Sequence, residues 1–148
     1  MPLFDKLAIS SPDITALERV PEPFTADGGH SVPRLAFDGV PAGTVELAVI
    51  CHDPDAPLPH GFTHWTVYGI APDAVELDLD AARVGPNTLG DLEWTGPEPP
   101  HGHGQHHYYF WVYALNRAVD GEPDRQAFLA DYTDAILEQA RFVATYSR

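Results

Sequence analysis

The sequence predicts a mainly β protein, a β-sandwich that carries one helix in its C-terminal part. Several segments rich in β-branched and aromatic residues have the composition of strands. Fifteen prolines and 12 glycines in 148 residues place turns throughout the chain and leave few stretches long enough for helices. Many strands and one amphipathic helix indicate a sandwich with the helix packed on its edge or face.

The expected strands follow one another along the chain. The first covers residues 45–52, where alternate residues from Val45 to Cys51 share one face. The second covers residues 63–70, and the third covers residues 106–115. Because the third strand has aromatic residues on both faces, we expect both of its faces to be covered. The first 33 residues alternate short apolar pieces with proline and glycine, as in loops and edge strands.

The helix is expected between Asp124 and Tyr146, where apolar residues recur at three- and four-residue spacing. Pro123 marks its start, and Arg141 suits the negative end of the helix dipole. Between the second and third strands, residues 83–104 are rich in glycine and proline and form a long excursion. Loops of that length in a compact domain are usually functional.

Composition limits the classes of function. The 148 residues fit one domain, 1–148, with a single core. A net charge of −14 repels phosphate backbones, which argues against nucleic-acid binding. The longest apolar run, residues 47–51, is too short to span a bilayer, so no integral membrane association is expected. The lack of a secretory signal and the single cysteine, Cys51, favour the cytoplasm.

Histidines gather close to the ends of the expected strands. They are His60, His64, His101, His103, His106 and His107. Strand parity puts His106 and Tyr108 on one face of the third strand. The carboxylate pair Asp53 and Asp55 follows the first strand. If His64 heads the second strand, these groups predict a small polar pocket at one end of the sheet.

Each of these features also has a simpler structural interpretation. The run from Asp53 to Pro57 can be a rigid turn, since proline fixes φ and aspartate caps turns. The histidines, above all His101 and His103, can be solvated loop residues. The aromatic stripe of residues 108–113 can belong to the core.

Three kinds of enzyme can be weighed against the sequence. A zinc site needs three or four converging ligands, and His101-Gly-His103 offers only one arm in flexible backbone, so we expect no metal and no cofactor. Asp53-x-Asp55 after an apolar strand suggests a phospho-aspartate phosphatase, but no lysine follows it. No serine lies in a Gly-x-Ser-x-Gly frame, and Cys51 is a core residue rather than a nucleophile.

Taken together, the residues resemble the phosphatidylethanolamine-binding protein family, most closely its bacterial and archaeal, Raf kinase inhibitor-like branch. The resemblance rests on DPDAP at 53–57, His64-Trp65, GPEPPHGHGQHHY at 96–108, and the flanks 32–35, 40–43 and 137–146, the last like a closing helix. It covers about residues 24–148. DPDAP with a downstream His-x-Tyr is a more specific signal than either motif alone.

The resemblance implies a two-sheet antiparallel β-sandwich with a C-terminal α-helix and a small anion pocket at one end. The residues carried over as ligand-binding are Asp53, Asp55, Pro57, His64, Gly96, Pro99, Pro100, Gly104, His106 and Tyr108. Such pockets hold phosphate, acetate or phosphorylethanolamine-type head groups.

Imidazole and phenol donors suit phosphate oxygens, and a nearby carboxylate orients a histidine or keeps it protonated. Asp53 is expected to bond to a ligand hydroxyl or ammonium group, or to pair with His64. The pocket therefore suits a zwitterionic or monoprotonated phosphate. Since a bound anion favours charged imidazoles at His64 and His106, affinity should rise as pH falls from about 7.5 to 5.5.

The sequence departs from the family pattern at three positions. His107 stands where arginine is usual, which removes a permanent charge. Thr63 stands where an aromatic residue usually precedes the histidine, so one pocket wall is expected to be smaller. Glu98 adds a negative charge at a rim position that is normally small and neutral.

We therefore expect a small-anion or phosphate-head-group binding protein, regulatory or inhibitor-like, more than an enzyme. One alternative is a His/Asp-dependent hydrolase of small phosphate or acyl esters, and another is a module that grips a phosphorylated protein partner. The strand 107–113 has more apolar surface than one core needs, so a homodimer is expected unless the C-terminal helix covers the excess.

Overall fold

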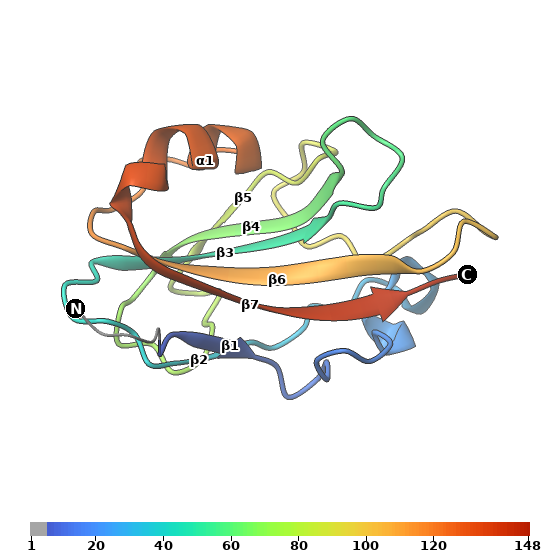
Figure 1. The fold of residues 1–148 in the computed structure, drawn as a ribbon, viewed down its shortest axis with the longest axis horizontal. Coiled ribbons are helices and arrows are strands. Elements are labelled where there is room, and N and C mark those ends of the chain that lie inside the picture. Colours follow the sequence, from blue (N-terminus) through green and yellow to red (C-terminus); the bar gives the residue numbers. More distant parts are fainter. Residues whose placement is uncertain (1–5) are drawn as a thin grey trace.

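The computed structural model describes residues 6–148 and is built on a five-stranded antiparallel sheet (Figure 1). Its strands lie in the order β5–β4–β3–β6–β7. They are β3 (Glu46–Asp53), β4 (Phe62–Ile70), β5 (Arg83–Gly85), β6 (His106–Leu115) and β7 (Ile136–Tyr146). A second, two-stranded antiparallel sheet joins β1 (Ala8–Ser10) to β2 (Ala36–Asp38). The prediction of a mainly β protein with two antiparallel sheets is confirmed.

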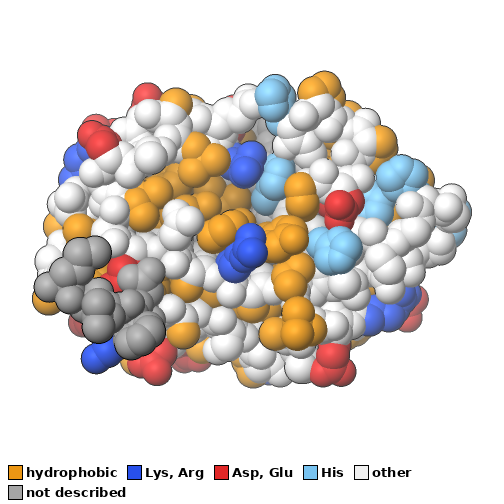
Figure 2. All heavy atoms as spheres, in the orientation of Figure 1, with side chains coloured by type: hydrophobic (Ala, Val, Ile, Leu, Met, Phe, Trp, Pro, Cys, Tyr) orange, Lys and Arg blue, Asp and Glu red, His pale blue; other side chains and the backbone are white. Residues whose placement is uncertain are grey.

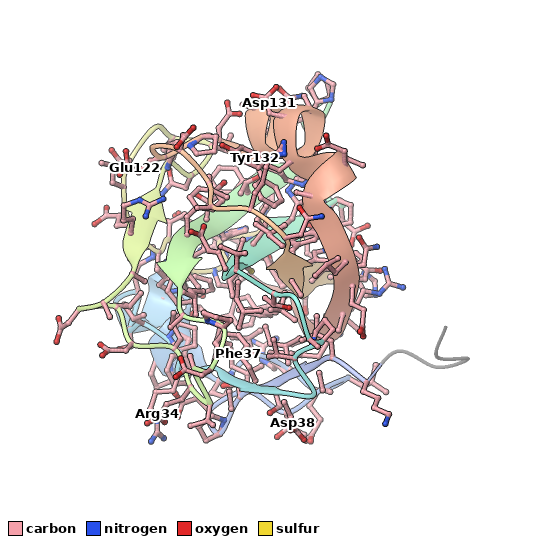
Figure 3. All side chains as sticks on the ribbon, turned by 90° about the vertical axis from the view of Figure 1, so that its left-hand side faces the viewer. Arg34, Phe37, Asp38, Glu122, Asp131 and Tyr132 are labelled. Atoms are coloured by element: carbon pink, nitrogen blue, oxygen red, sulfur yellow. The ribbon has the colours of Figure 1, made fainter. Side chains whose placement is uncertain are left out.

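The large sheet is the middle layer of the molecule. Helix α1 (Arg125–Tyr132) covers one of its faces, and β1 and β2 lie against the other (Figure 3). Short 3-10 turns cover Glu22–Phe24, Ala26–Gly28 and Thr133–Ala135. None of the helices within residues 6–148 has the length and apolar character needed to cross a bilayer.

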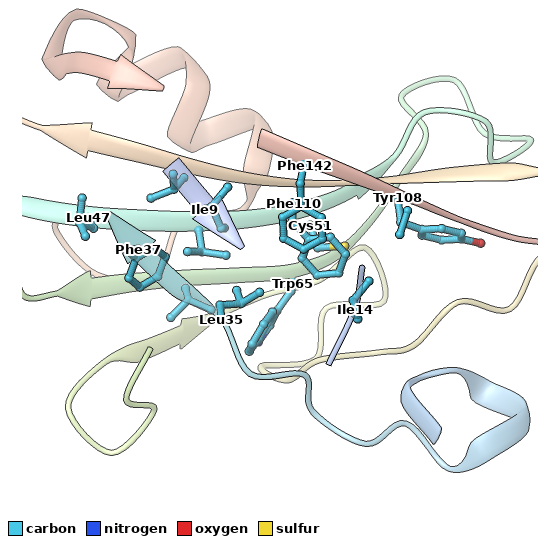
Figure 4. Packing of buried hydrophobic residues seen from close by; sticks show 14 of the residues in the cluster. Ile9, Ile14, Leu35, Phe37, Leu47, Cys51, Trp65, Tyr108, Phe110 and Phe142 are labelled. Carbon is cyan, nitrogen blue, oxygen red and sulfur yellow. The ribbon is translucent and has the colours of Figure 1, made fainter. Parts of the chain in front are cut away.

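Two apolar clusters fill the spaces between the layers. Leu47, Val49 and Cys51 of β3 are fully buried in the larger cluster, beneath β1 and β2 (Figure 4). Ile50, which points to the opposite face, belongs to the smaller cluster with Phe128 of α1. This alternation is the one that the sequence predicts for the first strand.

Aromatic residues of β6 pack on both faces of the strand, as the sequence predicts, although Tyr109 and Trp111 are only half-buried. Phe110 stacks on Phe142 of β7 in the larger cluster, with ring centroids 4.7 Å apart. Tyr113 packs against Phe128 of α1 on the other face, at 5.3 Å.

The prediction of a helix from Asp124 to Tyr146 is wrong beyond Tyr132. Asp124 caps α1 by accepting a hydrogen bond from the Ala127 N–H at 2.8 Å, but the helix has only eight residues. The remaining chain forms β7, which pairs with β6 from one end to the other. Without β7, β6 would be an edge strand with unpaired backbone groups, so pairing overrides the helical spacing of the apolar residues.

The long excursion after the second strand returns to the start of β4. It contains β5 and then irregular chain up to β6. The Thr88 N–H donates to the Thr63 carbonyl at 3.0 Å, and the Thr95 N–H donates to the His64 carbonyl at 3.1 Å. These bonds bring the segment that follows Thr95 beside the beginning of β4.

Candidate functional site

The site lies at one end of the large sheet, where three neighbouring strands meet. In an antiparallel sheet the end of one strand lies beside the start of the next. Asp53 therefore ends β3 next to Phe62, which begins β4, and next to His106, which begins β6. Histidine side chains gather toward this end of the molecule (Figure 2).

A cavity of about 300 Å³ opens there, with polar groups and a mostly apolar wall. It is lined by Asp53, Ala56, Pro57, Leu58, Phe62, His64, Leu89, Thr95, Gly96, Glu98, Pro99, Pro100, His106 and Tyr108. The cavity thus takes residues from β3, β4 and β6 and from the two loops that follow β3 and β5.

Asp53 and His106 form a buried pair within this cavity. Their Oδ2 and Nδ1 atoms are 2.6 Å apart, and their side chains are only 3% and 2% exposed. The other carboxylate oxygen of Asp53 accepts a hydrogen bond from the Asp55 N–H at 2.7 Å. Burial raises the pKa of the Asp53 carboxyl, and the bond from His106 opposes that shift. The carboxylate fixes His106 with a proton on Nδ1.

His64 is also buried, but its partner is a backbone carbonyl and not a carboxylate. Its Nδ1 is 2.7 Å from the carbonyl oxygen of Thr95, and because a carbonyl only accepts, this nitrogen carries the proton. Burial lowers the pKa of His64 to about 4, so the ring is neutral at pH 7. Its Nε2 is therefore a hydrogen-bond acceptor. Phe62 and Tyr108 hold the ring, with centroids at 4.6 and 5.2 Å.

Tyr108 brings a free donor to the cavity. Its ring is buried, and Figure 4 shows the hydroxyl pointing away from the packed core. No group within residues 6–148 forms a hydrogen bond with that hydroxyl. Burial raises the pKa of Tyr108 well above its usual range, so the hydroxyl keeps its proton and can donate it to a ligand.

Most residues of the predicted site lie together, but two do not line the cavity. Asp55 and Gly104 lie outside it. Asp55 instead accepts hydrogen bonds from the backbone N–H and from Nδ1 of His107, at 2.8 and 2.7 Å. His107 therefore ties the loop after β3 to the start of β6.

Two expectations about this site are wrong, namely the pairing of Asp53 with His64 and the smaller wall at Thr63. Asp53 pairs with His106 rather than with His64, whose partner is the Thr95 carbonyl. The wall near His64 is not reduced by Thr63, because alternate residues of β4 point to opposite sides and Phe62 supplies an aromatic ring.

Several cavity residues carry no signal in the sequence. Leu58, Leu89 and Thr95 come from irregular loops, where no periodicity indicates which way a side chain points. His103, interpreted above as a solvated loop residue, places its Nδ1 2.6 Å from Nε2 of His106. Within residues 6–148, no three potential metal ligands converge on one point.

Comparison with known proteins places the chain in a family. Residues 10–147 match the family described as phosphatidylethanolamine-binding protein. A UPF0098 protein from Methanothermobacter thermautotrophicus is 38% identical over 141 residues, which cover 88% of this chain and 91% of the relative.

Two solved structures share the whole fold. A phosphatidylethanolamine-binding protein homologue from Chlamydia trachomatis superimposes with a TM-score of 0.88 at 27% identity, over 98% of this chain and 99% of the other. YbcL of Escherichia coli, described as a member of the mammalian family, gives a TM-score of 0.87 at 28% identity, over 96% and 98%. The chain belongs to the phosphatidylethanolamine-binding protein family.

Proposed function

We propose that this protein binds a small anion, of the phosphate or phosphorylated head-group class, in the cavity at the end of the large sheet, and acts as a regulatory module. The observation that carries the proposal is the free Tyr108 hydroxyl beside the buried Asp53–His106 pair. A donor without a protein partner at the base of a cavity needs a ligand or water to satisfy it.

The balance of donors and acceptors favours an anion that itself carries a proton. At neutral pH, Tyr108 donates, whereas Nε2 of His64 and the Asp53 carboxylate accept. A fully deprotonated phosphate would face these acceptors without a proton to offer. A monoprotonated phosphate or a zwitterionic head group can donate to one of them while it accepts from Tyr108.

Titration calorimetry with inorganic phosphate tests the proposal. Tyr108→Phe should weaken binding about tenfold, because it removes one hydrogen bond to a charged group. His106→Ala should weaken binding further, and His101→Ala, which changes an exposed side chain outside the cavity, should leave affinity unchanged. Equal losses from His101→Ala and Tyr108→Phe would show that the cavity is not the binding site.

A hydrolase is the second candidate, and the Asp53–His106 pair favours it. A histidine oriented by a carboxylate is the arrangement that activates water as a general base. Small phosphate and acyl esters would be the substrates. Steady release of product from such an ester, abolished by His106→Ala, would replace binding with turnover as the function.

We also propose a homodimer that uses the uncovered part of the sheet. Tyr109 and Trp111 are half-buried, and Arg141 stacks over their rings at 4.9 and 5.0 Å. Hydrophobic side chains gather near the middle of this face, with basic side chains among them (Figure 2). Helix α1 packs on Tyr113, and Trp111 packs against the same cluster but stays half-buried. Light scattering should give twice the monomer mass, and a monomer at high protein concentration would contradict this.

A further inference from the structure

We propose that His103 competes with the anion inside the protein. Its ring occupies Nε2 of His106 until phosphate displaces it. This inference rests on the proposed function and adds to it a residue that controls access to the site. Its basis is a contact between the imidazole of His103, in the loop before β6, and that of His106, which lines the cavity.

Both ring nitrogens of His106 are engaged. Nδ1 bonds to Asp53, and Nε2 lies 2.6 Å from Nδ1 of His103. The two imidazole rings are tilted by 55°, with centroids 4.9 Å apart. His106 is 1% exposed, and neither of its ring nitrogens is without a partner. An anion can therefore reach Nε2 only after the His103 ring has moved.

The positions of the protons also show that His103 and the anion cannot bind Nε2 of His106 at the same time. Nδ1–H of His106 donates to Asp53, so Nε2 of a neutral His106 carries a lone pair, and Nδ1–H of His103 donates to that lone pair. An anion bound at Nε2 must use the same lone pair, with a proton of its own in place of the one from His103. A monoprotonated phosphate supplies that proton itself, which agrees with the ligand class proposed above.

The loop around His103 is exposed and contains two glycines, which allows the ring to move away from His106. His103 is exposed and stands between Gly102 and Gly104, whose φ angles are 75° and 89°. A Cβ built at either glycine would meet no atom within 4 Å, so the backbone on each side of His103 borders open space. Behind the loop, Arg148 accepts from the Gly102 N–H at 3.0 Å and donates from Nε to the Pro99 carbonyl at 2.8 Å. The loop stays attached while the side chain swings.

Titration with inorganic phosphate at pH 7 tests the competition. Because breaking one hydrogen bond is part of binding to the wild type, His103→Ala should bind phosphate about three- to tenfold more tightly. The matched variant His101→Ala, in the same exposed loop, should bind like the wild type. Unchanged or weaker binding by His103→Ala would overturn the inference, while loss of binding in His106→Ala would still support the proposed site.

A second measurement needs no ligand and separates the two proposals. In protein labelled with ¹⁵N-histidine and free of phosphate, His103→Ala should shift the Nε2 resonance of His106 toward that of an unbonded lone pair. His101→Ala should not move it. An Nε2 resonance that is identical in the wild type and in His103→Ala would overturn the inference, whether or not the protein binds phosphate.

Discussion

His52 and His64 are buried, and one ring nitrogen of each lies within hydrogen-bond distance of an uncharged group. Nδ1 of His52 lies 2.9 Å from the Thr63 hydroxyl, and Nδ1 of His64 lies 2.7 Å from the Thr95 carbonyl. Burial lowers the pKa of both residues to about 4, and the positive charge of Arg125 adds to the effect at His52. Both histidines are therefore neutral in the folded protein at pH 7.

These shifts predict that the protein loses stability in mild acid. The unfolded chain takes up protons at both residues near pH 6.5, whereas the folded protein does so only near pH 4. The free energy of unfolding therefore falls as pH drops from about 6.5 to 4, by about 3 kcal/mol for each histidine. Urea unfolding should show a loss between pH 7 and 4.5 that is about 2 kcal/mol smaller in His52→Gln.

His101 provides the control for this comparison. Its side chain is exposed, so His101→Gln should lose as much stability in acid as the wild type does. If His52→Gln and the wild type lost the same free energy, protonation of His52 would not contribute to acid unfolding.

The residues of the site could be predicted from the sequence, but their pairing could not. Strand parity and the DPDAP motif bring Asp53, His64, His106 and Tyr108 to one end of the sheet. Which histidine meets the carboxylate depends on how three strand ends lie beside one another, and the sequence does not indicate their register, which shifts between β3 and β4 after Cys51. The same limit applies to charge. The sequence predicts a cationic His64 between pH 7.5 and 5.5, but burial lowers its pKa to about 4 and keeps it neutral there.

At the scale of elements, the three central strands are predicted to within one residue at their ends, whereas the C-terminal segment is half helix and half strand. Apolar residues between 128 and 143 satisfy a helical period by coincidence. In the fold, alternate residues from Phe142 to Tyr146 are buried, which is the period of a strand. The local periodicity of a sequence does not show that the outer edge of β6 lacks a hydrogen-bonding partner, because that edge exists only in the assembled sheet.

The helix that does form depends on its first residue. Asp124 is the N-cap of α1 and bonds to the Ala127 N–H, and α1 carries Phe128 into the smaller cluster. Asp124→Ala should lower the free energy of unfolding by about 1 kcal/mol. Asp131→Ala, in the same helix and exposed, should change it by less than half as much. Equal losses in urea unfolding would mean that the cap contributes nothing.

At the scale of the whole molecule, the negative charge opposes the ligand that the cavity is proposed to bind. The chain has 22 acidic and 8 basic residues. Within residues 6–148 several arginines are committed to acidic partners, among them Arg34 with Asp13 and Arg148 with Asp27. An approaching phosphate is therefore repelled until it reaches the donors inside the cavity. The hydrogen bonds in the cavity therefore have to overcome the repulsion between the negatively charged protein and the anion.

This repulsion predicts an unusual salt dependence. Raising sodium chloride from about 0.01 to 0.15 M shortens the screening length from about 30 to 8 Å, so phosphate should associate faster rather than more slowly.

Glu98 lies at the cavity, and Glu98→Gln should raise phosphate affinity about twofold at low salt, as expected for two unit charges roughly 10 Å apart in water. Asp120→Asn removes the same charge in the loop after β6, beyond the opposite end of the sheet, and should have a smaller effect. Stopped-flow and calorimetric titrations measure both quantities. An association rate that falls with salt would mean that a local positive field, and not the net charge, governs the approach of the anion.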